Sequence, residues 1–471
     1  MQVETESFKQ NSKQAVGNQD LQARLRVLNG FVFKRNAAFA ELEDGEALRD
    51  RARAIKEKTI AHLDHYLIQL ETSITRLGGA VHWARTGDEA RAIILDIALK
   101  NGVKRVVKSK SMVTEEIDLN EALERGGVEA IETDLGEYIV QLAGERPSHI
   151  LAPAIHKSRG DISELFADKL GAVNLVEAEE LTAMARKQLR QKFCTADMGV
   201  TGANFAVAET GTIALVENEG NIRLSTTLPR IHVAVMGIEK VIPSLEDLAV
   251  FLRILARSAS GQKMSSYVSF ITGARRAGET DGARQFHLVI LDNGRTRILA
   301  DEEKRESLYC LRCGACLNVC PVYQKIGGHA YGSVYSGPIG SIITPQFVGL
   351  GKSKDLPFAS SLCGACREIC PVKINIPHIL LSLRSDWAEG KGGAGGAPSL
   401  MERMAFKAWG FAMRHRLLYN LIFRLPALFQ GPLLKDGKFD RLPFIFGGWT
   451  ENRDFPPLAR RSFRRMWRDG M

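Results

Sequence analysis

The 471-residue sequence contains no long hydrophobic run, since no stretch approaches the roughly 18 consecutive apolar residues that a membrane-spanning helix requires. Its polar first segment, residues 1–18, lacks the basic start and apolar centre of a secretory signal. No G-x-G-x-x-G motif follows a predicted strand, so no dinucleotide-binding fingerprint places a flavin or a nicotinamide in the chain. We therefore expect a soluble cytoplasmic protein.

Neither sign of charge dominates most of the chain. Apolar residues make up 45% and charged residues 25% of the sequence, close to the average of folded soluble proteins, and the length indicates two or three domains. The net charge is +9, but residues 401–471 hold 14 Lys and Arg against 6 Asp and Glu, a local surplus of eight. Such a segment suits nucleic acid, an anionic membrane surface or an acidic protein, and charge alone does not choose among them.

Hydrophobic periodicity predicts a helix over residues 45–77, because leucine and isoleucine recur there at alternating spacings of four and three. Beyond it, strands and helices alternate, which is typical of a parallel sheet covered by helices. The predicted strands are 80–84, 105–107, 130–133, 149–152, 205–208, 212–216, 232–235, 267–271 and 286–291. The predicted helices among them are 88–100, 115–125, 177–192 and 245–258.

These elements divide the chain into five expected segments. They are a helical extension (1–59), an α/β domain (60–300), a cysteine-rich domain (301–388), a flexible Gly-rich linker (389–399) and a basic C-terminal region (400–471). Within the basic region, residues 404–429 mix aromatic and aliphatic residues with arginine in an amphipathic helical pattern. The pattern predicts docking onto a partner or onto the protein itself, with peripheral membrane contact as the alternative.

Seven of the eight cysteines lie between Cys310 and Cys370 and form an internal repeat with an offset of 50 residues. Cysteines of a cytoplasmic protein stay reduced, so their clustering indicates a metal site and not disulfides. The string CGAC occurs at 313–316 and 363–366, and CPV occurs at 320–322 and 370–372. The first copy has the C-x-x-C-x-x-C-x-x-x-C-P spacing with which bacterial ferredoxins bind [4Fe-4S] clusters. We therefore predict two iron–sulfur sites.

In two-cluster ferredoxins the fourth cysteine of each motif binds the other cluster. The predicted ligands of the first site are Cys310, Cys313, Cys316 and Cys370, and those of the second are Cys320, Cys363 and Cys366. The repeat would place an eighth ligand at position 360, which is Ser360. Four interpretations stay open: Ser360 ligates iron as an alkoxide, water or substrate takes the open corner, the second site holds a [3Fe-4S] cluster, or Ser360 is an unligated loop residue.

Zinc is the alternative metal for the cysteine region. It prefers four nitrogen or sulfur ligands in a tetrahedron, commonly from two separated C-x-x-C pairs, and seven thiols with three at close spacing fit that pattern poorly. Cys194 has no partner at a metal-ligand spacing, so we expect it to be a buried and inert thiol.

Two Gly- and Thr-rich strings precede the cysteines: TGANFAVAETGTIALVENEGN at 201–221 and RLSTTLPRIHVAVMGIEKVIP at 223–243. The cysteine repeat lies within LRCGACLNVCPVYQKIGGHAYG at 311–332 and SLCGACREICPVKINIP at 361–377. In this order the strings resemble the iron–sulfur subunit of the three-component L-lactate utilization system, and the resemblance covers most of residues 60–470.

The resemblance implies an α/β LUD domain, similar to the sugar-isomerase and CoA-transferase group, followed by a mainly helical two-cluster ferredoxin-like domain and a basic helical C-terminal region. It implies the same seven cysteine ligands and two [4Fe-4S] clusters. It also implies a role in oxidising L-lactate to pyruvate with two other proteins, a cysteine-rich subunit and a second LUD-domain subunit.

Oxidation of a 2-hydroxy acid removes two electrons and two protons, whereas an iron–sulfur cluster accepts one electron at a time, so a further redox group is expected in the complex. A small organic acid needs a cationic or backbone N–H clamp and a nearby base. The candidate catalytic groups are Glu209 and His232. The candidate substrate-binding residues are Lys110, Thr201, Gly202, Asn204, Thr210, Gly211 and Arg230, although each is also explained as an ordinary turn, cap or surface residue.

Two other functions remain open. One is an electron relay for a dehydrogenase of a different small acid, because the sequence shows no lactate-sized pocket. The other is a nonenzymatic iron–sulfur sensor whose basic region binds nucleic acid. That region has no helix-turn-helix or RNA-binding signature, so no nucleic acid is expected as a partner.

Overall fold

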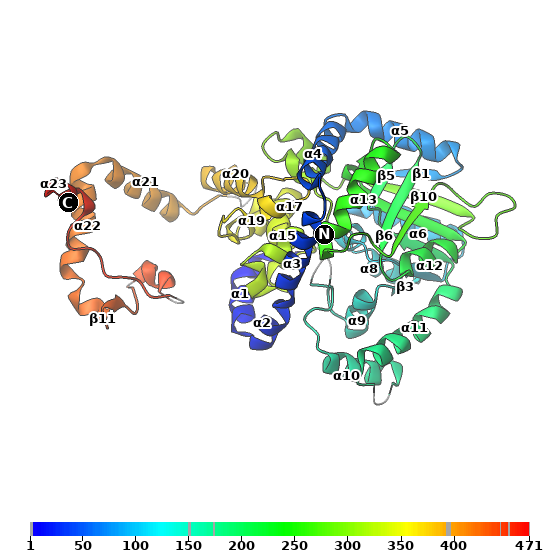
Figure 1. The fold of residues 1–471 in the computed structure, drawn as a ribbon, viewed down its shortest axis with the longest axis horizontal. Coiled ribbons are helices and arrows are strands. Elements are labelled where there is room, and N and C mark those ends of the chain that lie inside the picture. The colour runs from blue at the N-terminus through cyan, green and yellow to red at the C-terminus, as the bar shows by residue number, and fades with distance from the viewer. Residues whose placement is uncertain are drawn as a thin grey trace. The chain divides into compact units, whose positions relative to one another are not determined.

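The computed structural model describes residues 3–148, 152–172, 175–391, 397–442, 444–450 and 453–470. The chain forms two compact units, Met1–Ala397 and Pro398–Met471 (Figure 1). Their boundary falls in the segment 389–399, of which residues 392–396 lie outside the described residues. Most of the strand predicted at 149–152 also lies outside them.

The first unit contains a parallel sheet of six strands, with the order β1-β10-β7-β4-β2-β3 (Figure 1). In its register, Val233 of β7 lies between His287 of β10 and Val200 of β4. The strands are β1 (Ala80–Ala84), β2 (Arg105–Lys108), β3 (Glu129–Glu132), β4 (Met198–Thr201), β7 (Ile231–Gly237) and β10 (Gln285–Leu291). Because parallel strands end at the same edge, the loops that follow them bring residues from distant parts of the sequence together.

Both faces of this sheet are covered, so its central strands are apolar on both sides. Val233 and Val235 of β7 pack with α6 and α8, while Ala234 and Met236 belong to the core on the opposite face. The helices of this region are α6 (Gly87–Lys100), α7 (Met112–Glu116), α8 (Leu119–Arg125), α9 (Leu135–Ala143), α10 (Arg159–Leu170), α11 (Ala178–Cys194), α12 (Asn221–Thr227), α13 (Leu245–Ser260) and α14 (Arg295–Ala300). The predicted α/β architecture is confirmed.

A second sheet of four strands contributes to the core on that opposite face. Its order is β8-β5-β6-β9, with β5 antiparallel to β6 and parallel to β8. The strands are β5 (Phe205–Val207), β6 (Thr212–Glu217), β8 (Val241–Ile242) and β9 (Tyr267–Ile271). Three of the predicted strands therefore belong to this mixed sheet and not to the parallel one.

The N-terminal helices pack within the same unit as the sheets. They are α1 (Phe8–Gly17), α2 (Gln19–Leu25), α3 (Val27–Ala40), α4 (Gly45–Ala61) and α5 (Leu63–Arg76). The single helix predicted over 45–77 is two helices, because His62 leaves the helical conformation with φ −124° and ψ 40°. Helix α4 packs on α13 and α5 packs on β1 and β8, so the break directs one apolar stripe to two different neighbours.

The cysteine region is built from short helices. They are α15 (Ala315–Val319), α16 (Tyr323–Ile326), α17 (Gly337–Val348), α18 (Leu350–Ser353), α19 (Ala365–Ile369) and α20 (Ile376–Glu389). Helix α15 of the first cysteine copy packs against α19 of the second and also against α3. The two copies of the repeat therefore lie side by side in the first unit.

The second unit contains α21 (Leu400–Arg414), α22 (Arg416–Phe429), β11 (Leu434–Lys435), β12 (Lys438–Phe439) and α23 (Phe463–Arg468). Its two long helices follow the predicted amphipathic pattern. Within the residues described, every helix is too short or too polar to span a bilayer.

Several local features differ from the sequence-based expectations. The helix predicted over 115–125 is interrupted at Asp118, which has φ 49°, and the short strand β4 and helices α9 and α10 are not predicted. The prediction that Cys194 is buried is wrong, because its thiol is exposed. The buried stripe of α11 includes Leu189 and Phe193, and the next residue of a helix is turned about 100° from that stripe.

Candidate metal centre and the adjoining cavity

The two cysteine loops follow the same backbone path. Arg312 and Leu362, at equivalent positions of the repeat, both adopt the left-handed conformation, with φ of 63° and 55°. Gly314 and Gly364 also have positive φ, and each immediately precedes the short helix of its copy. The sequence repeat is therefore a structural repeat.

Ser360 occupies in its loop the place that Cys310 occupies in the first copy. The Cys310 Sγ accepts a hydrogen bond from the backbone N–H of Arg312 at 3.4 Å. The Ser360 Oγ accepts the equivalent bond from the N–H of Leu362 at 3.1 Å. The hydroxyl therefore stands where the repeat would place an eighth ligand.

Electrostatic repulsion identifies a first set of neighbouring thiols. Burial, together with repulsion from Cys370 and Cys310, raises the pKa of the Cys313 thiol to about 12. Burial also raises the pKa of Cys316, and the same three cysteines are among the groups that raise it further. These four thiols, from both copies of the repeat, lie together.

A second set adjoins the first. Burial, with repulsion from Cys320 and Cys363, raises the pKa of Cys366 to about 12. Cys316 of the first set also repels Cys366, so the two sets are neighbours. Cys363 is exposed, whereas Cys320 and Cys366 are buried. The exchange of the fourth cysteines between the two motifs stays a prediction, and it requires thiols of both copies to lie together in this way.

The donor set fits iron–sulfur clusters better than a zinc ion. Seven thiols from both loops form two neighbouring sets, which is more than the four ligands that one zinc ion takes. In a cubane each thiolate binds a different iron, so its sulfur ligands stand further apart than the ligands of one zinc. Burial raises the thiol pKa of five of these cysteines and so disfavours their thiolate form until a metal binds them, which suits a resident cofactor better than a reactive cysteine. They are Cys313, Cys316, Cys320, Cys366 and Cys370.

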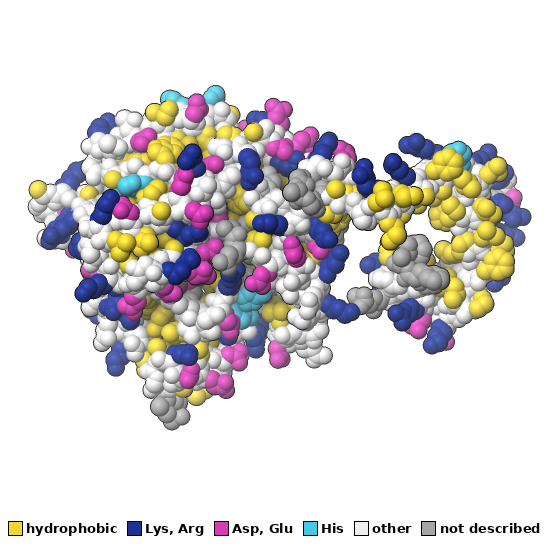
Figure 2. All heavy atoms as spheres, turned by 180° about the vertical axis from the view of Figure 1, so that it is seen from behind, with side chains coloured by type: hydrophobic (Ala, Val, Ile, Leu, Met, Phe, Trp, Pro, Cys, Tyr) yellow, Lys and Arg dark blue, Asp and Glu magenta, His cyan; other side chains and the backbone are white. Residues whose placement is uncertain are grey.

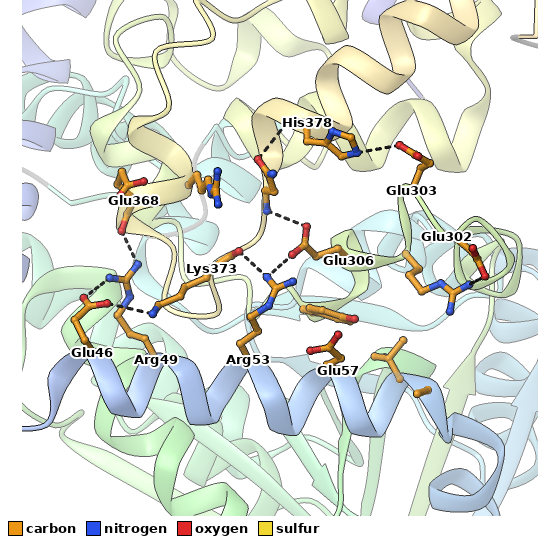
Figure 3. A pocket seen from close by; sticks show the side chains of 16 residues that line it. Glu46, Arg49, Arg53, Glu57, Glu302, Glu303, Glu306, Glu368, Lys373 and His378 are labelled. Carbon is orange, nitrogen blue, oxygen red and sulfur yellow. Dashed lines mark hydrogen bonds and ion pairs between the residues drawn. The ribbon is translucent and has the colours of Figure 1, made fainter.

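A charged pocket of about 780 Å³ lies between helix α4 and the second cysteine motif, and arginine side chains of α4 line it and bind the motif (Figure 3). Arg49 donates hydrogen bonds to the backbone carbonyls of Cys370 at 2.9 Å and of Glu368 at 2.5 Å. Arg53 donates to the backbone carbonyl of Lys373 at 2.7 Å. The N-terminal helices therefore fix the backbone on both sides of one predicted cluster ligand.

A buried ionic network joins the α/β region to the first cysteine loop. Arg295 of α14 pairs with Glu116 at 2.8 Å and with Glu239 at 2.6 Å, and all three side chains are at most 2% exposed. Arg312 reaches the other carboxylate oxygen of Glu239 at 3.5 Å and lies over the ring of Tyr335. Although burial raises it, the Arg295 and Arg312 guanidinium groups lower the pKa of Glu239 to about 2. The carboxylate therefore stays charged and holds the two regions together.

A cavity of about 600 Å³ opens beside this network, at the carboxyl ends of the parallel strands. Its lining comes from the loops after β2, β3, β4 and β7, from α13, and from the first cysteine loop. Lys110, Lys240, Arg312 and Cys313 are among the lining residues. Ligands of open α/β sheets bind at this edge, and here the edge adjoins a predicted cluster ligand.

Three of the predicted substrate residues line the cavity, namely Lys110, Gly202 and Asn204. The Asn204 side chain also has a structural role, because its Oδ1 accepts a hydrogen bond from the N–H of Val216 at 2.9 Å. Gly202 lies so close to Ser111 that an added Cβ would be 2.6 Å from the Ser111 hydroxyl oxygen. The loop after β4 therefore shapes the cavity wall.

Four other candidates lie away from the cavity. Glu209, Thr210 and Gly211 form the turn between β5 and β6, which packs against α5. Arg230 precedes β7 and is therefore at the amino edge of the sheet, where it donates to the carbonyl of Asn101. The structure does not bring these four residues together with Lys110.

Thr201 and His232 are buried inside the sheet. The Thr201 Oγ1 and the His232 Nε2 are 2.8 Å apart, and both side chains are at most 1% exposed. Burial, with repulsion from His287, lowers the pKa of His232 to about 3, so the imidazole is neutral at physiological pH. In the described structure neither residue lines the cavity.

Comparisons with known proteins match three successive parts of the chain. A LUD domain matches residues 67–291, a 4Fe-4S dicluster domain 306–374, and the C-terminal domain of lactate utilisation protein B 383–471. Lactate utilization protein B of Bacillus licheniformis is 44% identical over 100% of this chain and 98% of its own length. The Bacillus subtilis protein is 43% identical over 100% of this chain and 97% of its own length. The Shouchella clausii protein is 46% identical over 96% of this chain and 92% of its own length.

The chain belongs to the lactate utilization protein B family. The predicted resemblance is confirmed, and all seven clustered cysteines fall within the 4Fe-4S dicluster domain. The parallel sheet and most of the cavity lining belong to the LUD domain.

The sequence patterns miss Ser109, Lys240 and Arg312, which line the cavity of this family member. A usable signal exists for Lys240, because it closely follows the fully buried strand β7, and polar residues after a buried parallel strand lie at the ligand-binding edge. Arg312 has no such signal. Whether its side chain reaches the cavity depends on how the cysteine loop packs on the LUD domain.

The buried imidazole predicts that stability falls in mild acid. His232 has a pKa of about 3 in the folded chain and about 6.5 when unfolded, so between these values the unfolded chain binds a proton that the folded chain does not. The contribution is complete above pH 6.5 and falls by about 1.4 kcal/mol per pH unit below it. Urea denaturation at pH 7.5, 6.5 and 5.5 measures this slope. His232→Gln should show a shallower slope, and equal slopes would contradict the prediction.

Proposed function

We propose that the chain is the iron–sulfur electron-transfer subunit of a multi-protein complex that oxidises L-lactate to pyruvate. Its partners in this proposal are a cysteine-rich subunit and a second LUD-domain subunit. Support comes from the 4Fe-4S dicluster domain and from full-length relatives named lactate utilization protein B. In the same proposal the LUD domain has the fold of the sugar-isomerase and CoA-transferase group.

The observation that carries the proposal is the arrangement of the thiols. The first set adjoins the cavity through Cys313, and the second set reaches the surface at the exposed Cys363. The two sets are neighbours through Cys316 and Cys366. An electron relay needs an inner end near the substrate and an outer end near an acceptor, and this order of groups supplies both.

When bound at these cysteines, iron–sulfur clusters supply one-electron transfer. The chain's own residues hold the ligand loops in place. The backbone N–H of Arg312 donates to the Cys310 sulfur, which stabilises negative charge on that ligand. We propose [4Fe-4S] at both sites, with Ser360 beside the fourth corner of the second, and [3Fe-4S] at the second site as the alternative.

Anaerobic reconstitution tests the function. With the two partner proteins present, L-lactate should reduce the clusters of this chain, which is measured as loss of visible absorbance and appearance of an EPR signal. Without the partners no reduction is expected. D-lactate, glycolate and 2-hydroxybutyrate in parallel assays distinguish a lactate relay from a relay for another small acid. Protein with full iron content that no acid reduces in the presence of both partners would contradict the proposal.

The second unit presents the surface on which we propose that a partner protein docks. On α22, Leu417, Leu421, Leu425 and Leu428 lie on one face and are 84%, 50%, 44% and 73% exposed. Figure 2 shows hydrophobic side chains gathered on this unit among Lys and Arg. Its cations are 11 Arg and 3 Lys. Protein interfaces are enriched in Arg, Met and aromatic residues and depleted of Lys, which favours a protein partner over lipid.

The double variant Leu421→Glu/Leu428→Glu should weaken binding to the partner proteins roughly tenfold or more, because charge replaces apolar contacts in the centre of an interface. Co-purification and calorimetric titration measure the loss, and iron content should not change. The matched control is Ile68→Glu/Leu99→Glu, whose parent side chains are 63% and 55% exposed in the first unit. Liposome flotation that depends on Leu421 and Leu428 would identify a lipid surface instead.

A further inference from the structure

The cationic end of the cavity contains polar groups without partners. Arg312 Nη1 and Ser109 Oγ are both buried and have no hydrogen-bond partner within the described structure. Both residues line the cavity. Buried donors are almost always paired in folded proteins, so an orphaned pair in one cavity indicates a missing ligand.

Lys240 adds a further unpartnered cation. Among the described residues, its ammonium group makes no hydrogen bond or ion pair. It is attracted over a longer range to Glu239 and Cys310, and it is repelled by Arg312, Arg295 and Lys56. Burial is the main cause that lowers the pKa of Lys240 to about 8. Lys240 and Arg312 therefore lie near one another. Glu239 attracts both, but Lys240 forms no ion pair with it and Arg312 reaches it only at 3.5 Å.

The cavity is polarised along its length. Asp134, Glu217 and Glu219 line it in addition to the cations, and Lys110 is the cation that interacts with Glu219. Burial, with repulsion from Asp134, raises the pKa of Glu219 to about 7. Glu239 also lines the cavity beside Lys240, but it is already paired with Arg295 and Arg312. An acid with one carboxylate would therefore place that group beside the cations, away from Asp134, Glu217 and Glu219.

We propose that this cavity binds the carboxylate of a small 2-hydroxy or 2-oxo acid, with Lys240 and Arg312 as its cationic clamp and Ser109 as an additional donor. The inference rests on the proposed function and names the substrate site within it. Cys313 lines the same cavity, so the bound acid would lie beside the first thiol set. The volume of about 600 Å³ is within the range of roughly 300–1,000 Å³ that is usual for small-molecule sites.

Binding of pyruvate to the full-length, cluster-loaded chain tests this assignment without turnover. Anaerobic calorimetry measures the Kd of pyruvate for the wild-type chain. Lys240→Gln should raise this Kd roughly 10- to 100-fold, which is the usual effect of losing a hydrogen bond to a charged group. Lys240→Arg should recover most of the affinity. The matched control is Lys187→Gln on the exposed face of α11. Iron content and EPR signals should be equal in all four proteins.

The cations could alternatively serve only to balance the negative charge of a nearby cluster. In that case Lys240→Gln would shift the cluster's reduction potential and leave pyruvate affinity unchanged, and the proposal would be overturned. Equal affinity for sulfate, or no pyruvate binding at millimolar concentration, would overturn it as well. If pyruvate binds through Lys240 but the reconstituted complex does not oxidise lactate, the proposed function fails and the carboxylate site stands.

Discussion

Cys370→Ala should remove about four of roughly eight iron atoms per chain, and the lost cluster should be the one that the first motif binds. Cys370 belongs to the second motif in the sequence, but its thiol lies among those of Cys310, Cys313 and Cys316. The other cysteines near this cubane are those of the second set, which are the predicted ligands of the other cluster, so none of them is free to replace a lost thiolate ligand. Iron and acid-labile sulfide analysis with EPR, on protein purified without oxygen, measures the effect.

Comparing variants of cysteines from the two motifs shows which cysteines bind the same cluster. Cys370→Ala and Cys310→Ala should lose the same EPR signal, whereas Cys320→Ala and Cys363→Ala should lose the other one. If each motif held its own cluster, Cys320→Ala would instead match Cys310→Ala. Cys194→Ala is the control, because this exposed cysteine lies outside both thiol sets and should leave all iron in place.

Arg295→Met should lower the free energy of unfolding by about 3–5 kcal/mol, the usual cost of removing one partner from a buried ion pair. The variant leaves the carboxylates of Glu116 and Glu239 in the interior, where they are 0% and 2% exposed. Glu116 loses its arginine partner, and Glu239 keeps only Arg312, at 3.5 Å, as an ion-pair partner. A buried carboxylate without a cation has a raised pKa, so the folded variant takes up protons more readily than the unfolded one. The difference in the free energy of unfolding between the wild-type chain and Arg295→Met should therefore become smaller as pH falls from 8 to 6. Urea denaturation of both proteins across this range measures it.

Two further variants identify the cause. Arg85→Met removes an exposed ion pair with Glu89 and should cost no more than about 0.5 kcal/mol. Arg295→Met combined with Glu116→Gln should recover part of the stability, because one buried charge is removed. A loss of less than about 1 kcal/mol in Arg295→Met would show that the network does not hold the two regions together.

Much of the local structure follows from the sequence, because hydrophobic period and turn residues act over short distances. Leu67, Leu70 and Ile74 are buried on α5 as their spacing predicts. The limits of that reasoning appear at His62, where packing of α4 and α5 on different neighbours breaks a continuous pattern. They appear again at β4, which lies between β7 and β2 in the sheet. Its four residues are too few to show a recognisable hydrophobic pattern.

The sequence by itself determined which cysteines form the repeat, that position 360 lacks one, and which family the chain resembles, because these depend on residue identity and spacing alone. Only the tertiary structure decided what surrounds the first cysteine loop. Lys240 follows a strand of the LUD domain, Arg312 lies between two predicted cluster ligands, and Ser109 follows another strand, yet all three line one cavity. Their meeting depends on long-range packing of the cysteine region against the carboxyl edge of the sheet, which no local pattern of residues encodes.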